Sequence, residues 1–331
     1  MKLSDDIKAE REIEELRRAL KTAQAGEYRA KRKSEELVEA VYRAAYDSGI
    51  AVGRSKQLSK PPQKDTRKSK QEIALVHATD WQLGKKTISY GMTTCAARMD
   101  QLIDKVLTLT EIQRSHHPVK KLIVLFGGDM VEGITVFPGQ AWEIEAHLFE
   151  QLFEASRIME KMIRVYASYF ETVQVVCEFG NHGRLGRKGE LPSGDNIDAM
   201  AYRITKDRVQ DLNNVSWQMS NDWYQIVIAG EYRALLVHGD EVKSSGGIVR
   251  KANAWATGVI EPFQDVYMGH FHTPMAVTMA NGGRIFVTGS PESHNEYARE
   301  FIGATSVPSQ RVHFIDPAKG RVTAEYVVWL E

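Results

Sequence analysis

The sequence predicts an α/β protein in which two packed sheets are flanked by helices. From Ile73 onward, short apolar runs of strand length alternate with longer segments of helical periodicity. The region from Ser216 on is richer in short strands, which indicates that a second sheet follows the first. Hydrophobic residues make up 43% of the 331 residues, enough to bury a large core.

Each predicted element rests on its own pattern. Four apolar runs are predicted to be short buried strands: Ile73–Ala78, Leu122–Phe126, Val173–Cys177 and Ala234–Val237. Helical periodicity is present in residues 97–115, 141–168 and 196–211. Further strands are predicted at Tyr224–Ala229, Ala276–Met279, Arg284–Thr288, Arg311–Ile315 and Val322–Val328. Asn281-Gly282 lies between two of these strands and is a hairpin turn signal.

Residues 1–50 are predicted to form an amphipathic, coiled-coil-like helical extension. Apolar residues recur there mostly at three- or four-residue steps among dense charge, and the first proline is Pro61. The apolar seam is narrow and is interrupted around Ala25-Gly26, which favours a helical hairpin or a broken coiled coil over one rod. Such a seam serves equally for docking on the rest of the chain and for a homo-oligomer.

Residues 51–71 have the composition of a mobile linker before a catalytic domain at 72–331. Residues 53–70 contain Gly, Ser, Pro-Pro and seven Lys or Arg residues with a single Asp65. Such a charge run is usually solvated chain. The alternative is that residues 54–70 contact nucleic acid.

Charge and cysteine content set outer bounds on function. The formal net charge is zero, so no global steering toward polyanions is implied. Residues 1–70 contain 18 basic and 12 acidic residues, whereas residues 71–331 contain 25 basic and 31 acidic residues. A basic N-terminal segment therefore precedes an acidic remainder of the chain. Cys95 and Cys177 are too few for a disulfide framework, and no apolar N-terminal stretch resembles a signal peptide or a membrane span. We expect a cytoplasmic protein without membrane contact.

Five short polar segments follow in an order typical of a two-metal phosphoester site. They are Asp80-Trp81-Gln82, Gly128-Asp129, Gly180-Asn181-His182, Val237-His238-Gly239 and Gly269-His270-Phe271-His272. Most of them end an apolar run, so their polar side chains should project from strand ends into a common crevice.

The residue types suit phosphoester hydrolysis, which needs a nucleophile and neutralisation of the phosphoryl oxygens. Two divalent cations about 3.5–4 Å apart can do both, provided that a carboxylate bridges them and N or O ligands complete each site. The chain supplies that mixture in Asp80, Asp129, Asn181, His238, His270 and His272. Only two of these are anionic, so two dications and a bridging hydroxide would leave a cluster that attracts phosphate.

The motifs resemble those of the calcineurin-like metallophosphoesterase superfamily over about residues 72 to 330. The matching segments are Asp80-x-Gln82, Gly128-Asp129-x-x-Glu132, Gly180-Asn181-His182, His238-Gly239 and Gly269-His270-x-His272. Each motif alone is weak, whereas five in order are specific for the superfamily but not for a substrate. Their order is similar to that of the nuclease subunit of the double-strand-break repair complex, and a helical, basic prefix is typical of a bacterial or phage DNA-metabolism protein.

The resemblance implies a hydrolase that acts on phosphoester bonds with a hydroxide activated by two divalent metal ions. The first metal would be held by Asp80, Gln82, Asp129 and His272, and the second by Asp129, Asn181, His238 and His270. His182 would be the general acid that faces the leaving oxygen. Glu132 would orient that histidine, and Arg184 would contact a phosphate oxygen.

Gln82 departs from the family pattern, which has histidine at this position. An amide oxygen is neutral like imidazole but harder, so the first metal should bind more weakly. The change favours manganese or magnesium over zinc, with iron or zinc as alternatives. Activity is still expected, because the other motif residues are present.

Several other residues have a simpler structural interpretation. Lone histidines such as His77, His147 and His313 are more often satisfied, partly buried side chains than ligands. Trp81, Trp142 and Trp255 are expected in the core rather than at a substrate entrance.

Three functions are left open by the sequence. A nuclease or other phosphodiesterase acting on DNA is favoured by the basic linker and by Arg184, Arg187 and Lys188 beside the acid histidine. A phosphatase or small-molecule phosphodiesterase is the first alternative. The second is a metal-stabilised binding module that no longer turns over substrate. Fold cannot decide between them.

Overall fold

The computed structural model describes residues 15–22, 24–26, 64–67, 70–134, 136–137, 139–186, 188–259, 261–292 and 307–331. Contacts divide the chain into two units, Met1–Arg54 and Ser55–Glu331. None of the helices in the described ranges combines the length and apolar character that crossing a bilayer requires.

The first unit contains helix at residues 15–22 and 24–26, where Leu16 and Leu20 are exposed. Ala25 and Gly26, at which the predicted apolar seam is interrupted, are themselves helical. The rest of the extension, and most of the linker predicted at 51–71, lie outside the described residues. The three-part division of the chain therefore stays a prediction.

The first sheet joins the beginning and the end of the second unit. Its strands are β1 (Glu72–Ala78), β2 (Val119–Phe126), β3 (Thr172–Cys177), β4 (Val215–Met219), β10 (Ser309–Asp316) and β11 (Arg321–Trp329). Across the sheet they are ordered β11-β10-β1-β2-β3-β4. Strands β1 to β4 are parallel, whereas β10 pairs antiparallel with β1 and β11 with β10. The carboxyl ends of β1, β2 and β3 consequently meet at one edge of the sheet.

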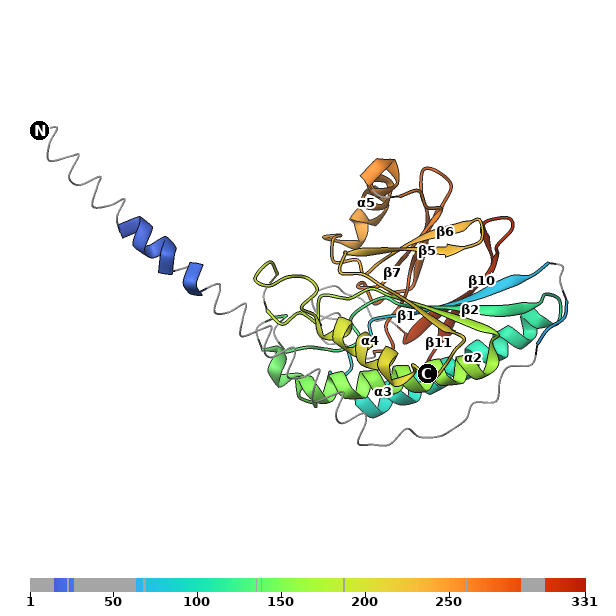
Figure 1. Ribbon diagram of the computed structural model, residues 1–331, viewed down its shortest axis with the longest axis horizontal. Coiled ribbons are helices and arrows are strands. Elements are labelled where there is room, and N and C mark those ends of the chain that lie inside the picture. The colour runs from blue at the N-terminus through green and yellow to red at the C-terminus, as the bar shows by residue number, and fades with distance from the viewer. Residues whose placement is uncertain are drawn as a thin grey trace, which may run out of the picture. The chain divides into compact units, whose positions relative to one another are not determined.

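Three helices flank this sheet on the side away from the second sheet, as Figure 1 shows. They are α2 (Met92–Arg114), α3 (Leu148–Tyr169) and α4 (Ile197–Arg208). Helix α3 buries Leu152, Met159 and Tyr166, which recur on one face. It begins later than the predicted 141, since the Glu150 carboxylate accepts the His147 backbone N–H at 2.8 Å and caps the helix there.

The second sheet is built from five shorter strands. They are β5 (Tyr224–Ala229), β6 (Tyr232–Val237), β7 (Asp265–Met268), β8 (Met275–Thr278) and β9 (Arg284–Val287). Their order is β5-β6-β7-β9-β8, with β6, β7 and β9 parallel and the two outer strands antiparallel to their neighbours. Strands β8 and β9 form the predicted hairpin, and Gly282 has a φ of 85° in its turn. The predicted α/β architecture of two sheets with flanking helices is confirmed.

The core lies between the two sheets and continues beyond the second. Leu75 and Ile123 of the first sheet pack in one cluster with Leu236, Tyr267 and Phe286 of the second. On the outer face of the second sheet a further cluster includes α5 (Ile248–Ala254) and the π-helical turn η3 (Trp255–Val259). Burial of apolar area on both faces holds the central strands in place.

The structure corrects some predicted details. Strands β4 and β7 and helix α5 were not predicted, since each is short and β7 begins with the polar Asp265. Residues Gln140–Trp142 form a separate 3-10 turn, η1, instead of belonging to α3. The core assignment is right for Trp81 and Trp255 but wrong for Trp142, which is 91% exposed on this turn.

Candidate metal centre

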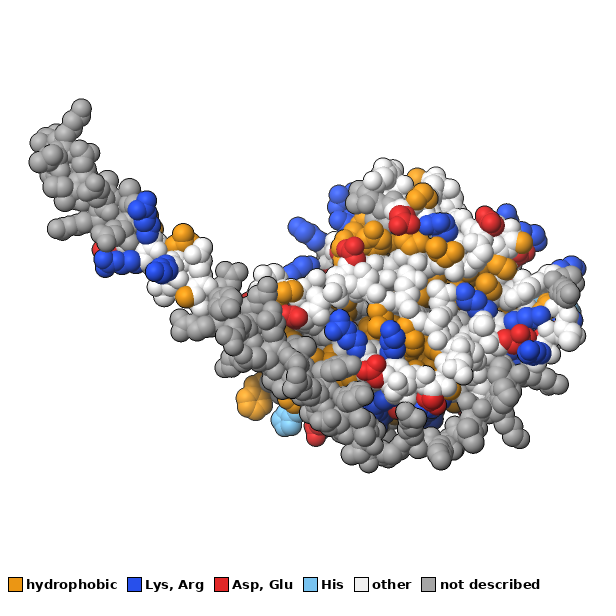
Figure 2. Space-filling model, in the orientation of Figure 1, with side chains coloured by type: hydrophobic (Ala, Val, Ile, Leu, Met, Phe, Trp, Pro, Cys, Tyr) orange, Lys and Arg blue, Asp and Glu red, His pale blue; other side chains and the backbone are white. Residues whose placement is uncertain are grey.

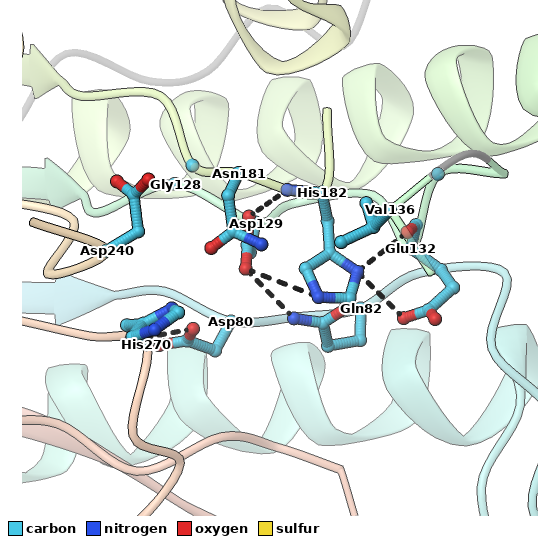
Figure 3. Close-up of polar contacts among 12 residues, drawn as sticks. Asp80, Gln82, Gly128, Asp129, Glu132, Val136, Asn181, His182, Asp240 and His270 are labelled. Carbon is cyan, nitrogen blue, oxygen red and sulfur yellow. Dashed lines mark hydrogen bonds and ion pairs between the residues drawn. The ribbon is translucent and has the colours of Figure 1, made fainter. Parts of the chain in front are cut away.

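The predicted metal ligands lie in loops at the carboxyl ends of five strands, three from the first sheet and two from the second. Asp80 with Gln82, Asp129 and Asn181 follow β1, β2 and β3, and His238 and the pair His270 and His272 follow β6 and β7. Figure 3 shows Asp80, Gln82, Asp129, Asn181 and His270 together in one group. Residues 190 positions apart, such as Gln82 and His272, are in contact here.

The Asp129 carboxylate is at the centre of this group. Its Oδ2 lies 3.1 Å from His238 Nε2 and accepts the Gln82 Nε2–H at 3.2 Å. Its Oδ1 accepts the backbone N–H of His182 at 2.7 Å. Ligand atoms of Asp129, His238 and His270 all lie within 4.8 Å of one another. A carboxylate with ligands on both sides has the placement that a bridging role requires.

A second group surrounds the fully buried Asp80. His272 Nε2 is 3.5 Å from Asp80 Oδ1, and the Gln82 Nε2 is 3.4 Å from the same imidazole nitrogen. The backbone N–H of His270 donates to both Asp80 oxygens, at 2.9 and 3.0 Å. These contacts bring together Asp80, Gln82 and His272, which the sequence assigns to the first metal. On the other side Asn181 Oδ1 lies 3.2 Å from His238 Nε2, within the set assigned to the second.

Backbone conformation singles out the same residues. In the described part of the chain six non-glycine residues have positive φ, and five of them are predicted ligands. These five are Asp80 (54°), Gln82 (47°), Asp129 (53°), His270 (67°) and His272 (55°). The left-handed region costs an ordinary residue about 1–2 kcal/mol, and such strain collects where function fixes a side chain. The fold thus holds the ligand side chains in an unfavourable backbone conformation in order to point them inward.

The donor set fits a pair of divalent cations. Two buried carboxylates, three imidazoles and two amides are N and O ligands of the type that manganese, iron and zinc accept. Gln82 Oε1 is buried and has no hydrogen-bond partner among the described residues, although a buried amide oxygen normally has one. The Gln82 Nε2 faces Asp129 and His272, so the amide would turn over to bring this oxygen onto a cation at the first site.

The charges of the group are strongly coupled. Burial alone would raise the pKa of Asp129, but the neighbouring His238 and His182 hold it well below its ordinary value. Burial would lower the pKa of His238, yet the Asp129 charge raises it well above the usual range. For His270, burial and the His238 charge lower the pKa to about 4. Asp129 is therefore a carboxylate at neutral pH, as a metal ligand must be.

His182 lies at the edge of the centre with Glu132 behind it. Its Nδ1 is 2.8 Å from the Glu132 carbonyl oxygen and 3.4 Å from Glu132 Oε2, while its Nε2 is 3.9 Å from Asp129 Oδ2 (Figure 3). Gln140 Nε2 donates to Glu132 Oε1 at 2.9 Å. Burial would lower the pKa of His182, but the charges of Asp129 and Glu132 raise it to about 9. Glu132 thus lies where it can orient and charge the imidazole.

Arg184 pairs with an acidic residue that borders the centre. Its guanidinium pairs with Asp240, which also lies 3.1 Å from Lys188 Nζ. Burial would raise the pKa of Asp240, but the charges of His238 and Arg184 lower it to about 2. Arg187, the third predicted basic contact, lies outside the described residues. The basic residues after His182 therefore border the site through Asp240.

Asp198 was not identified from the sequence, yet it joins two ligand loops. Its buried carboxylate accepts backbone N–H groups from Asp129 at 2.8 Å, Met130 at 3.1 Å and Gly180 at 2.9 Å. Burial and the Asp129 charge raise its pKa to about 6. The sequence signal was the helix start Asn196-x-Asp198, where Asn196 caps α4 through its own side chain. That pattern predicts a cap but not the contact with β2 and β3.

Glycines let these two loops approach each other. A Cβ on Gly128, whose φ is 89°, would lie 2.4 Å from the Gly180 backbone nitrogen. A Cβ on Gly180 would lie 2.0 Å from Asp129 Oδ1. The Gly-Asp and Gly-Asn pairs of the motifs are thus required for packing as well as for chemistry.

Glu292 is a further residue that the sequence did not assign. Its Oε2 lies 3.2 Å from His272 Nδ1, and its Oε1 pairs with Lys85 Nζ at 2.9 Å. A carboxylate on one imidazole nitrogen fixes the tautomer and turns the other nitrogen toward the metal position. Here the other nitrogen, Nε2, faces Asp80.

The sequence was compared with family models and with known proteins. No family model matches the sequence. The SPbeta prophage-derived uncharacterized protein YonJ of Bacillus subtilis (strain 168) is 22% identical over 203 residues, which is 60% of this chain and 46% of YonJ. The match therefore covers less than half the length of that protein.

Solved structures with a related fold were also found. A predicted phosphoesterase from Streptococcus pneumoniae TIGR4 is 14% identical with a TM-score of 0.32, covering 77% of this chain and 98% of its own. Zinc-bound Vps29 from Entamoeba histolytica is 11% identical with a TM-score of 0.35, covering 78% of this chain and 99% of its own. A metallophosphoesterase from Sphaerobacter thermophilus is 13% identical with a TM-score of 0.31, covering 78% of this chain and 89% of its own.

Two of these structures carry the names predicted phosphoesterase and metallophosphoesterase, the class of protein that the motifs resemble. Because the TM-scores are low, residue roles depend on the contacts described above and not on these overlaps. The similarity to double-strand-break repair nucleases stays a prediction.

We predict that Asp198→Asn destabilises the protein by about 1–3 kcal/mol, because the amide places N–H groups against backbone donors. Urea unfolding at neutral pH measures this, and a manganese titration of the same variant should show weaker binding. Asp104→Asn, at an exposed position on α2, is the control and should leave both unchanged. Equal unfolding midpoints for the two variants would contradict the bridging role.

Gln82→His should tighten metal binding at the first site by about tenfold, since imidazole is a stronger ligand than an amide oxygen for most first-row divalent metals. Calorimetric titration with manganese and with zinc measures the change, and zinc should gain more. Gln101→His, on the surface of α2, serves as the control. No change in either titration would mean that this side chain does not bind metal.

Proposed function

We propose that the protein is a metal-dependent phosphoesterase. The observation that carries the proposal is the convergence of seven N and O ligands from five strand ends, with Asp129 at their centre and five of the seven held at positive φ. Asp129 would bridge the ions, with Asp80, Gln82 and His272 on one side and Asn181, His238 and His270 on the other. When bound, two divalent ions neutralise phosphoryl oxygens and acidify water.

His182 supports a hydrolytic function more directly than the ligands do. With its pKa raised to about 9, the imidazole carries a proton at neutral pH. Its side chain is partly exposed at the edge of the site, so Nε2 can reach a leaving oxygen. Bound cations would oppose this positive charge, whereas the Glu132 carboxylate on Nδ1 would continue to support it. General acid catalysis is the role that this arrangement suits.

We further propose that the substrate is a phosphodiester of DNA. The basic sequence at 54–70 and the exposed Lys188 near the site support a polyanionic substrate. The prophage origin printed for YonJ agrees with a phage or bacterial context. On the face shown in Figure 2, basic and acidic side chains are interspersed, so the attraction would be local.

The function is tested by an activity screen of the full chain with manganese, magnesium, iron and zinc. We expect hydrolysis of single- or double-stranded DNA and of bis(4-nitrophenyl) phosphate, strongest with manganese and absent with excess chelator. Asp129→Ala should abolish it. DNA cleavage should fall steeply with salt, while the small ester should change little. Hydrolysis of phosphomonoesters alone would indicate a phosphatase, and metal binding without turnover of any ester would contradict the proposal.

His182→Gln should lower kcat about 10²–10⁴-fold for DNA, whose alkoxide leaving group needs a proton. The loss should be much smaller for bis(4-nitrophenyl) phosphate, because nitrophenolate leaves without protonation. His116→Gln, an exposed residue after α2, is the control. Equal losses on both substrates would assign His182 a structural role instead of general acid catalysis.

A further inference from the structure

A cleft of about 430 Å³ adjoins the candidate metal centre. It is lined by the loop between β3 and α4, by Trp223 before β5 and by Asp240 and Glu241 after β6. Gly180, in its wall, directly precedes the ligand Asn181, and Asp240 follows the ligand His238 by two residues. The cleft therefore opens beside the ligands assigned to the second metal, and its volume exceeds that of a nucleobase.

Two carboxyl groups in the cleft have unused hydrogen-bonding capacity. Glu178 is 1% exposed, and its Oε1 accepts the Phe179 backbone N–H at 3.1 Å. The Oε2 atoms of Glu178 and Glu241 are both buried, and neither has a hydrogen-bond partner in the part of the chain that the structure describes. An unsatisfied buried acceptor costs about 1–3 kcal/mol, so a fold retains two of them at one cavity only at some loss of stability. Glu178 has the Gln225 side chain as a neighbour and Glu241 has Asp240, and a ligand with N–H donors would supply the contact that the two Oε2 atoms lack.

An aromatic side chain forms another part of the cleft wall. Trp223 is half-buried, with its ring 5.5 Å from that of Trp255 and 5.0 Å from that of Tyr224. These contacts hold the indole in place, and Leu185 and Leu191 add aliphatic surface to the lining. A fixed aromatic ring beside aliphatic side chains is suited to a flat, heteroaromatic ligand.

Basic groups lie where the cleft meets the metal centre. Arg184 and Lys188 both contact Asp240, and all three line the cleft. A ligand that places its ring at Trp223 would have these cations beside any phosphate directed toward the centre. In a bound nucleotide, the ring wall and the carboxyl groups would face the base, and the basic edge would face the phosphate.

We infer that the cleft binds the nucleobase of the nucleotide attached to the reacting phosphate, and that it selects bases with an exocyclic amino group over thymine. The inference rests on the proposed function, because it takes the metal centre as the phosphate position. Adenine, guanine and cytosine carry an exocyclic amino group whose two N–H donors can serve two carboxyl acceptors, whereas thymine offers only its single ring N3–H. Trp223 supplies stacking that any base can use.

The test uses deoxynucleosides with the full chain in excess chelator, so that neither metal nor phosphate contributes. We expect NMR titration to give affinities for deoxyadenosine, deoxyguanosine and deoxycytidine about tenfold or more above that for thymidine. Trp223→Ala should weaken all four, and Trp329→Ala, a half-exposed tryptophan on β11, should weaken none.

Glu178→Met separates recognition from a structural role. We expect this variant to lose the preference over thymidine and to raise Tm, because it removes a buried carboxyl group whose Oε2 has no hydrogen-bond partner among the described residues. Glu178→Gln, which keeps the shape, should also lose most of the preference. A lower Tm with unchanged binding, or equal affinity of the wild type for all four nucleosides, would overturn the inference.

Hydrolysis of bis(4-nitrophenyl) phosphate by the wild type, measured in parallel, distinguishes this inference from the proposed function. Hydrolysis without selective nucleoside binding overturns the inference and leaves the phosphoesterase intact. Selective binding without hydrolysis of any ester supports the cleft and overturns the catalytic proposal.

Discussion

The candidate site depends on one buried carboxylate, that of Asp129. It must be ionised within a protein interior, where an isolated charge is costly, and the surrounding groups make this possible. His238 and the His182 backbone N–H contact its two oxygens directly, and Asp198 fixes the backbone from which it projects. The positive φ values, the glycine contacts and the convergence of the strand ends all serve to place this group.

The two sides of the Asp129 carboxylate differ in chemistry. Toward β1 and β7 the proposed ligands include Gln82, whose oxygen has no partner among the described residues, and His272, whose Nδ1 faces Glu292. Toward β3 and β6 they are Asn181 and His238, and the cleft with its aromatic and carboxyl lining lies beyond them. His182, the proposed acid, is on the edge supported by Glu132. A reacting phosphoester would therefore meet metal ligands, a proton donor and a recognition cleft in separate directions.

Much of the fold was predictable, because apolar runs ending in polar motifs mark the parallel strands and their functional edge. Asp80, Asp129 and His238 were identified in this way, and the structure brings them together. Asp198 was not, since its partner Asp129 is 69 residues away and its local sequence indicates only a helix cap. Glu292 contacts His272 through folding alone, and the Arg184 pairing with Asp240 depends on the tertiary placement of the loop after β6. Local sequence carries residue type and periodicity but not these long-range contacts.

The ligands come in nearly equal parts from the two sheets, which also meet through apolar packing and through hydrogen bonds such as that of Tyr267 on β7 with His313 on β10. Ions seated between them would act as a non-covalent cross-link across the sandwich. By mass action, such binding makes the integrity of the whole domain depend on how much free metal surrounds it. Cellular metal supply would then govern the lifetime of this protein as well as its turnover, with scarcity leaving the halves of the sandwich joined only by their apolar packing and their direct polar contacts.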